Sequence, residues 1–94
     1  MKKLFTLLSI SLVFCSVLFA DTLTFKNGSN INGVYFKLYF KENITYKYLN
    51  RYRIPSGSSI EIDIGNDNYY NYGYKQEDDS NIQNCYSDEI TLYP

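Results

Sequence analysis

Histidine and tryptophan are absent from the 94 residues, and only two cysteines and two prolines occur. Histidine is the side chain whose charge changes near neutral pH, and it is the commonest metal ligand. Without it, acid–base catalysis falls to carboxylates, Lys or Tyr, and a cysteine lacks the partner that usually activates a thiol nucleophile. The sequence also has no glycine-rich phosphate-binding pattern. We therefore expect neither an enzyme nor a cofactor-binding protein.

Two acidic segments contain the oxygen ligands that calcium prefers, DIGNDN (63–68) and EDDSN (77–81). Neither has the spacing of an EF-hand loop, and turns rich in Asp and Asn form without a metal. Glu77, Asp78 and Asp79 are adjacent, so their side chains cannot all converge on one reacting bond. We interpret both segments as solvated loops and predict no metal site.

Residues 1–20, MKKLFTLLSISLVFCSVLFA, have the pattern of a secretory signal peptide. A short basic start precedes an apolar run that ends at Ala20, and polar Asp21 follows. We predict cleavage after Ala20 and an exported protein, either periplasmic, on the cell surface or secreted. The run reaches the lower length limit of a membrane span, so an uncleaved anchor is the alternative. A lipoprotein starting at Cys15 fits less well, because bulky Phe14 precedes it.

Removal of residues 1–20 would leave residues 21–94 as one small domain with no transmembrane segment. Lys2 and Lys3 would be lost, so 7 basic residues would face 10 acidic ones, a net charge of about −3. Cys85 would be the only cysteine, which excludes an internal disulfide. Core packing or self-association must then stabilise the fold. We expect Cys85 to be a small buried hydrophobic residue, with an intermolecular disulfide as the alternative.

Alternation of apolar and polar residues with period two recurs along this domain, and no segment has convincing helical periodicity. The strands expected from it are 22–26, 34–41, 42–52, 59–64, 69–75 and 89–93. Six or seven short strands joined by tight turns predict an all-β fold, a small antiparallel β-sandwich of the immunoglobulin-like kind. A small closed β-barrel is the alternative.

The dipeptide Asn27-Gly28 predicts a tight type I′ hairpin turn, because both central residues of that turn need positive φ. Phe25 would then lie opposite Asn30. A bulge at Asn32-Gly33 would bring Ile31 into register with the next strand; otherwise Ile31 is exposed.

One face of each strand supplies the expected core. Leu23 shares a face with Phe25, and Tyr70 shares one with Tyr72 and Tyr74. The residues expected to be buried together are Val34, Phe36, Leu38, Phe40, Ile60, Ile62, Ile64, Ile90 and Leu92.

The stretch GVYFKLYFK (33–41) carries Tyr and Lys on its other face, and more basic residues follow. Tyr and Arg are favoured at binding hot spots. The candidate binding residues are Tyr35, Lys37, Tyr39, Lys41, Lys47, Arg51 and Arg53. The alternative is that the lysines only guard a strand rich in β-formers against aggregation.

Charge is distributed unevenly along the domain. Residues 37–53 contain five basic residues against Glu42, whereas residues 54–94 contain only Lys75 against eight acids. Either basic and acidic strands are neighbours in one sheet, with Lys and Arg facing Glu61 and Asp63, or the surface is dipolar.

These observations predict a binding or interaction module that holds an anionic partner on its Tyr/Lys face. The partner would be a protein, a glycan or an envelope polymer. Nucleic acid is not expected, because export and a negative net charge both disfavour contact with a phosphate backbone. The alternative function is a self-associating structural or envelope-associated subunit.

Overall fold

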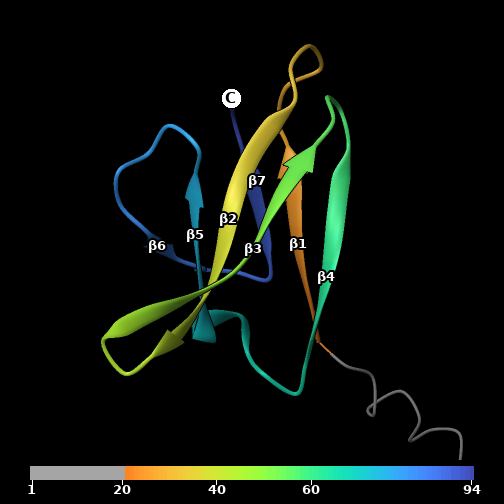
Figure 1. Cartoon of the computed structure of the whole chain (residues 1–94). Helices are drawn as coiled ribbons and strands as arrows, with labels where there is room; N and C mark the ends of the chain where they lie inside the picture. The colour runs from red at the N-terminus through yellow and green to blue at the C-terminus, as the bar shows by residue number, and fades with distance from the viewer. Residues whose placement is uncertain (1–20) are drawn as a thin grey trace, which may run out of the picture.

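The computed structural model describes residues 21–94, so the predicted signal peptide and Cys15 lie outside the described residues. Residues 21–94 form seven strands in two sheets that pack against each other (Figure 1). The strands are β1 (Asp21–Asn27), β2 (Val34–Glu42), β3 (Thr45–Ile54), β4 (Ser59–Gly65), β5 (Tyr72–Gln76), β6 (Gln83–Asn84) and β7 (Glu89–Leu92). The prediction of an all-β fold with six or seven strands is confirmed.

One sheet has the order β4-β1-β7 and the other the order β3-β2-β5-β6. The sheets are not closed into a barrel, so that alternative is wrong. All pairs are antiparallel except β1 with β7, which run parallel. The expectation of a wholly antiparallel sandwich is therefore wrong at this pair, which joins the first strand of the domain to the last.

The core lies between the two sheets. It is formed by the strand faces that the alternation predicts to point inward. Leu23, Phe25, Phe36, Leu38 and Ile90 are almost completely excluded from solvent, and the rings of Phe25 and Phe36 meet across the sheets at 4.2 Å. Of the nine residues expected in the core, Val34, Phe36, Leu38, Ile64, Ile90 and Leu92 are buried, whereas Phe40, Ile60 and Ile62 are only partly buried and pack on its margin. Ile54, Tyr72, Tyr74 and Cys85 complete the core.

The predicted hairpin turn at Asn27-Gly28 is wrong. β1 pairs with β4 and β7, so the chain after Asn27 crosses to the other sheet instead of folding back. The Asn27 side chain is buried and acts as a clamp. Its amide donates to the carbonyl oxygens of Asn32 at 2.6 Å and Ile54 at 3.0 Å, and its Oδ1 accepts from the Ser29 N–H at 2.8 Å.

Gly28 makes a close approach and does not have a positive φ. The φ angles that are positive in residues 21–94 belong to Asn43, Gly57 and Gly65. The ring of Tyr93 lies so close to Gly28 that a Cβ would overlap it. The predicted bulge at Asn32-Gly33 is also wrong, because no strand runs there and Ile31 is exposed.

Two predicted strands are displaced. The β2–β3 turn lies at Asn43-Ile44, where Asn43 has a φ of 58°, so Ile44 is 90% exposed instead of lying on a strand face. Residues Tyr69–Asn71 form a short 3₁₀ helix, η1. At its start the Asn71 Oδ1 accepts from the Asn68 N–H at 3.1 Å, and the Asn71 N–H donates to the Asn68 carbonyl oxygen at 2.9 Å. Tyr70 is therefore exposed and does not share a face with Tyr72 and Tyr74.

Candidate functional site

The candidate site is the outer face of the four-stranded sheet. Successive side chains of a strand alternate between faces, and Phe36 and Leu38 of β2 point into the core, so Tyr35 and Lys37 point out. Directly opposed residues share a face, which adds residues from β3 and β5. We call the following set the basic face: Tyr35, Lys37, Tyr39, Lys41, Tyr46, Tyr48, Arg51, Arg53, Gly73 and Lys75.

Six of the seven residues predicted from the sequence belong to this face, and Lys47 does not. Lys47 lies opposite Phe40, a residue that packs on the core. The cause is a β-bulge: Leu38 pairs with Asn50 and Tyr39 with Tyr48, which leaves Leu49 as an extra residue on β3. One extra residue reverses the alternation beyond it. Arg51 and Arg53 therefore share the face with Tyr46 and Tyr48.

Three cations form a row across adjacent strands of the basic face. Lys37 on β2 lies directly between Arg51 on β3 and Lys75 on β5. Like charges that oppose each other directly destabilise a sheet. In the described part of the chain Lys37 and Lys75 form no ion pair, because its two ion pairs join Arg51 to Glu77 and Lys26 to Glu89. The row thus carries an unbalanced positive charge.

Glu77 is the acid at the edge of this row. It accepts from Arg51 Nε at 3.2 Å and Nη2 at 3.1 Å. These hydrogen bonds lower the pKa of Glu77, and the nearby charges of Arg51, Lys37 and Lys75 lower it further. Glu77 therefore stays ionised at neutral pH and fixes Arg51, but it offsets only one of the three charges.

Tyr35 supports the two arginines. The guanidinium carbon of Arg51 lies 4.3 Å from the centre of the Tyr35 ring, and that of Arg53 lies 5.8 Å from it. A cation at such a distance is attracted to the face of an aromatic ring. Tyr35 thus holds both guanidinium groups over the sheet, beside Lys37.

A tyrosine cluster adjoins the cations. The Tyr39 ring lies edge-to-face against Tyr48 at 5.8 Å and against Tyr46 at 6.4 Å. Tyr46 reaches across the sheet, and its hydroxyl donates to the Asn84 side chain on β6. Gly73 makes this crossing feasible, because a Cβ there would lie 2.7 Å from Tyr46 Cε1. Tyr48 remains 53% exposed, so the cluster offers an aromatic surface beside the cations.

Lys75, Tyr46 and Tyr48 belong to the basic face but are missing from the sequence-based set. Alternation along residues 69–75 places Lys75 on the opposite face of its strand from Tyr74, and no other feature of the sequence indicates where Lys75 points. Its position beside Lys37 depends on the order of the strands, which the sequence does not state. Tyr46 and Tyr48 can be assigned to this face only when the bulge at Leu49 is known, because the bulge reverses the alternation along β3. Together, these side chains can bind and neutralise a row of negative groups.

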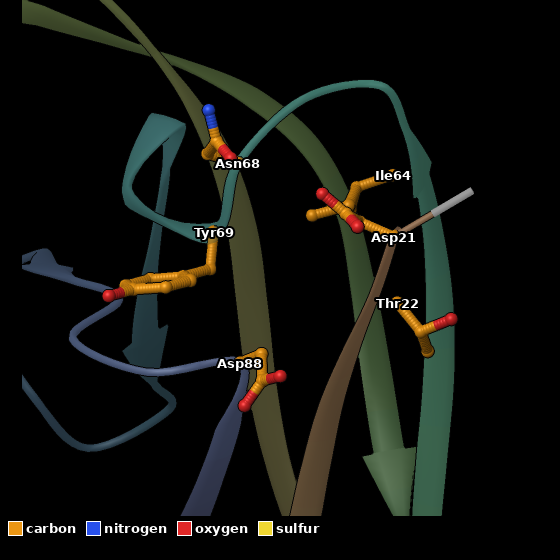
Figure 2. Close-up of a pocket in the computed structure, with 6 residues that line it drawn as sticks. All are labelled: Asp21, Thr22, Ile64, Asn68, Tyr69 and Asp88. Carbon is orange, nitrogen blue, oxygen red and sulfur yellow. The ribbon is translucent and has the colours of Figure 1, made fainter. Parts of the chain in front are cut away.

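A separate hollow of about 250 Å³ lies at the end of the sandwich where β1 begins (Figure 2). Asp21 and Asp88 border it from different segments, with the ring of Tyr69 across from Asp21. Its remaining lining residues are Thr22, Ile64 and Asn68. Residues 21–94 contain no group of three or more Cys, Asp or Glu side chains placed to hold a metal ion.

Cys85 is buried at 2% exposure, which confirms that it is a small core residue. Burial raises the pKa of its thiol from 9.0 to about 12. The thiol therefore stays protonated at neutral pH, and the thiolate is the reactive form. Burial of the sulfur disfavours the alternative of an intermolecular disulfide.

We expect Cys85 to resist a thiol-specific chromogenic reagent in the folded protein at about pH 8 and to react at once in denaturant, because both burial and protonation protect it. Absorbance at fixed reagent concentration measures both rates. The matched control is Ser87→Cys in a Cys85→Ala background, which places a thiol on the same segment with more exposure. Equal rates for the two proteins would contradict the burial of Cys85.

No helix within residues 21–94 has the length and apolar character needed to cross a membrane. Comparison of the chain with protein-family models, with curated proteins and with solved structures found no match.

Proposed function

We propose that this protein is a binding module that holds an anionic partner on its basic face. The observation that carries this proposal is the row Arg51, Lys37 and Lys75 on three adjacent strands. Each directly opposed like-charge pair costs the isolated domain about 0.2–1 kcal/mol. A bound anion would convert that repulsion into attraction. A surface that destabilises its own fold and is relieved by a ligand is typical of a functional site.

The arrangement favours a partner that presents several negative groups. Neighbouring strands are about 4.8 Å apart, so the row offers cations at that interval. The tyrosine cluster beside the row supplies flat apolar surface for the uncharged part of the partner. Export remains part of this proposal and is supported by the pattern of residues 1–20. An immunoglobulin-like topology also remains a proposal, supported by two sheets of three and four strands.

The position of Lys37 favours binding over the alternative role of a guard against aggregation. Guard charges act where a strand edge is open to a second chain. β2 is not an edge, because β3 and β5 pair with its two sides. Lys37 therefore protects no open edge.

The test removes the two unpaired cations together, as Lys37→Gln with Lys75→Gln. We expect binding to polygalacturonate, a polymer with one carboxylate per sugar, to weaken about tenfold or more, since each surface charge contributes about 1 kcal/mol. Titration at low ionic strength, followed by fluorescence of the tyrosines, measures it. We also expect the free energy of unfolding to stay constant or rise by about 0.2–1 kcal/mol, because the repulsion between the neighbouring cations is removed.

The matched control is Lys47→Gln, which removes the same charge from the opposite side of the sheet and should leave the affinity unchanged. Unmodified dextran controls for sugar contacts without charge. Unchanged binding of the folded double variant, or no binding by the unaltered protein at low salt, would overturn the proposed function.

A further inference from the structure

The outer face of the three-stranded sheet carries the opposite charge. Leu23 and Phe25 point inward, so Thr22, Thr24 and Lys26 point out, together with the residues that oppose them on β4 and β7. We call the following set the acidic face: Thr22, Thr24, Lys26, Glu61, Asp63, Glu89 and Thr91. The one cation, Lys26, is already paired with Glu89 at 3.1 Å. Within the described residues, Glu61 and Asp63 form no ion pair.

Acidic residues form a row on this face that matches the row of cations. Thr24 on the central strand lies directly between Glu61 on β4 and Glu89 on β7. The two acids are therefore two strands apart, which is about 9.5 Å. Arg51 and Lys75 are also two strands apart, on either side of Lys37. Both rows thus place their outer charges at the same interval.

The acidic face also has a hollow. A hollow of about 310 Å³ lies on the acidic face, lined by Thr22, Thr24, Glu61, Asp88 and Glu89. The small side chain of Thr24 lies in the middle of this row, at the position that corresponds to Lys37 in the basic row. Asp88, which is labelled in Figure 2, adds a further carboxylate to the rim. A lysine centred between two other cations fits such a hollow.

We propose that the anionic partner of the basic face is the acidic face of a second copy of this chain. Lys37 of one copy enters the hollow of the next, while Arg51 and Lys75 lie against Glu61 and Glu89. This inference rests on the proposed function and names its partner. The two faces lie on the outer sides of opposite sheets of one sandwich (Figure 1). The contact is therefore head-to-tail, and each added copy leaves one face of either kind free, which produces open stacks.

A second copy explains more of the surface than an external polymer does. An acidic glycan would satisfy the basic face and leave Glu61 unmatched, whereas stacking also gives Glu61 a cation. The contact joins exposed, hydrated charges: the side chains of Lys26 and Glu89 are 47% and 55% exposed. Such contacts are weak individually and are screened by salt. Assembly should consequently respond steeply to ionic strength and protein concentration.

The first test is sedimentation velocity of the protein purified after expression of the full chain. We expect the average mass to rise with protein concentration at about 0.01 M salt and to return to that of a monomer at about 1 M, where the screening length falls from roughly 30 to 3 Å. Polygalacturonate should dissociate the stacks by competing for the basic face. A monomer at low salt and high protein concentration would overturn the inference.

The second test exchanges the charges of one face at a time. The double variant Glu61→Lys, Glu89→Lys keeps the basic face, and the double variant Lys37→Glu, Lys75→Glu keeps the acidic face. Each should be monomeric alone at low salt, and an equimolar mixture should associate, because one unaltered face of each kind is then present. Thermal unfolding checks that both variants fold. The milder pair Glu61→Gln, Glu89→Gln serves if charge reversal prevents folding.

The outcomes separate this inference from the proposed function. Binding of polygalacturonate by a protein that stays monomeric would leave the proposed function standing and refute the second copy as partner. Association of the unaltered protein that neither double variant disrupts would also refute it, and would assign assembly to strand edges. If each double variant is monomeric by itself and only their mixture associates, the result supports contact between these two faces.

Discussion

Phe36→Ala is expected to lower the free energy of unfolding by about 3–5 kcal/mol, the range for removing a fully buried aromatic side chain. Phe36 has 0% exposure, and its ring lies 4.2 Å from Phe25 of the facing sheet and 5.4 Å from Tyr52 of the neighbouring strand. The truncation therefore opens a cavity where the two sheets meet. Small domains have unfolding free energies near the lower end of about 5–15 kcal/mol, so the variant should be largely unfolded at 37 °C.

Urea unfolding followed by circular dichroism measures this effect. Ile31→Ala is the control, because Ile31 is 83% exposed and its truncation should change the free energy by less than about 0.5 kcal/mol. Ile62→Ala should fall between the two, since Ile62 lies on an edge strand and is only partly buried. A Phe36→Ala protein with an unchanged urea midpoint would contradict the assignment of the core.

Asn27→Asp is expected to destabilise the fold by roughly 2–4 kcal/mol at neutral pH, because it places a charged acceptor where a donor is needed. The amide nitrogen of Asn27 serves the carbonyl oxygens of Asn32, Ile54 and Pro55 at 2.6, 3.0 and 3.3 Å. A carboxylate in its place would face three oxygens without a proton to share. The loop that carries the chain from β1 to β2 would lose its clamp.

The pH dependence of this variant gives a sharper test. Surrounding carbonyl oxygens raise the pKa of the introduced carboxyl in the folded state above its unfolded value of about 3.9. The folded state then binds the proton more tightly, so the destabilisation is complete well above the folded pKa and shrinks as pH falls towards about 3.9. Urea midpoints at neutral and acidic pH, each relative to the unaltered protein, measure it. Asn30→Asp adds the same charge to an exposed position of that loop, and an equal loss there would contradict the clamp.

Alternation alone predicted the two faces of β2, because the pleat of a strand sends neighbouring side chains to opposite sides. Phe36 and Leu38 are buried and Tyr35 and Lys37 face outward, as their spacing indicated. The same reasoning failed for Lys47, because an extra residue at Leu49 reverses the faces of β3. A bulge depends on how two strands pair, and no local pattern in residues 45–54 marks it.

Contacts distant in sequence explain the other differences. Asn27-Gly28 has strong local turn propensity, yet β4 and β7 bind the two edges of β1, and the Asn27 amide finds partners in distant loops. The expectation that basic strands neighbour the strand carrying Glu61 and Asp63 is wrong for the same reason. β4 pairs with β1 in the other sheet, so the uneven charge of the sequence becomes two faces of opposite sign.

The parallel pairing of β1 with β7 has a consequence for how the chain acquires its structure. Asn27 pairs with Leu92, 65 positions later. Closing a loop of that length costs an entropy equivalent to roughly 4 kcal/mol before the pair contributes any stability, and folds dominated by such distant contacts form in milliseconds to seconds. β1 is also the central strand of its sheet, so one of its edges stays unpaired until β7 has been synthesised. The fold of residues 21–94 therefore cannot be completed before β7 has been synthesised.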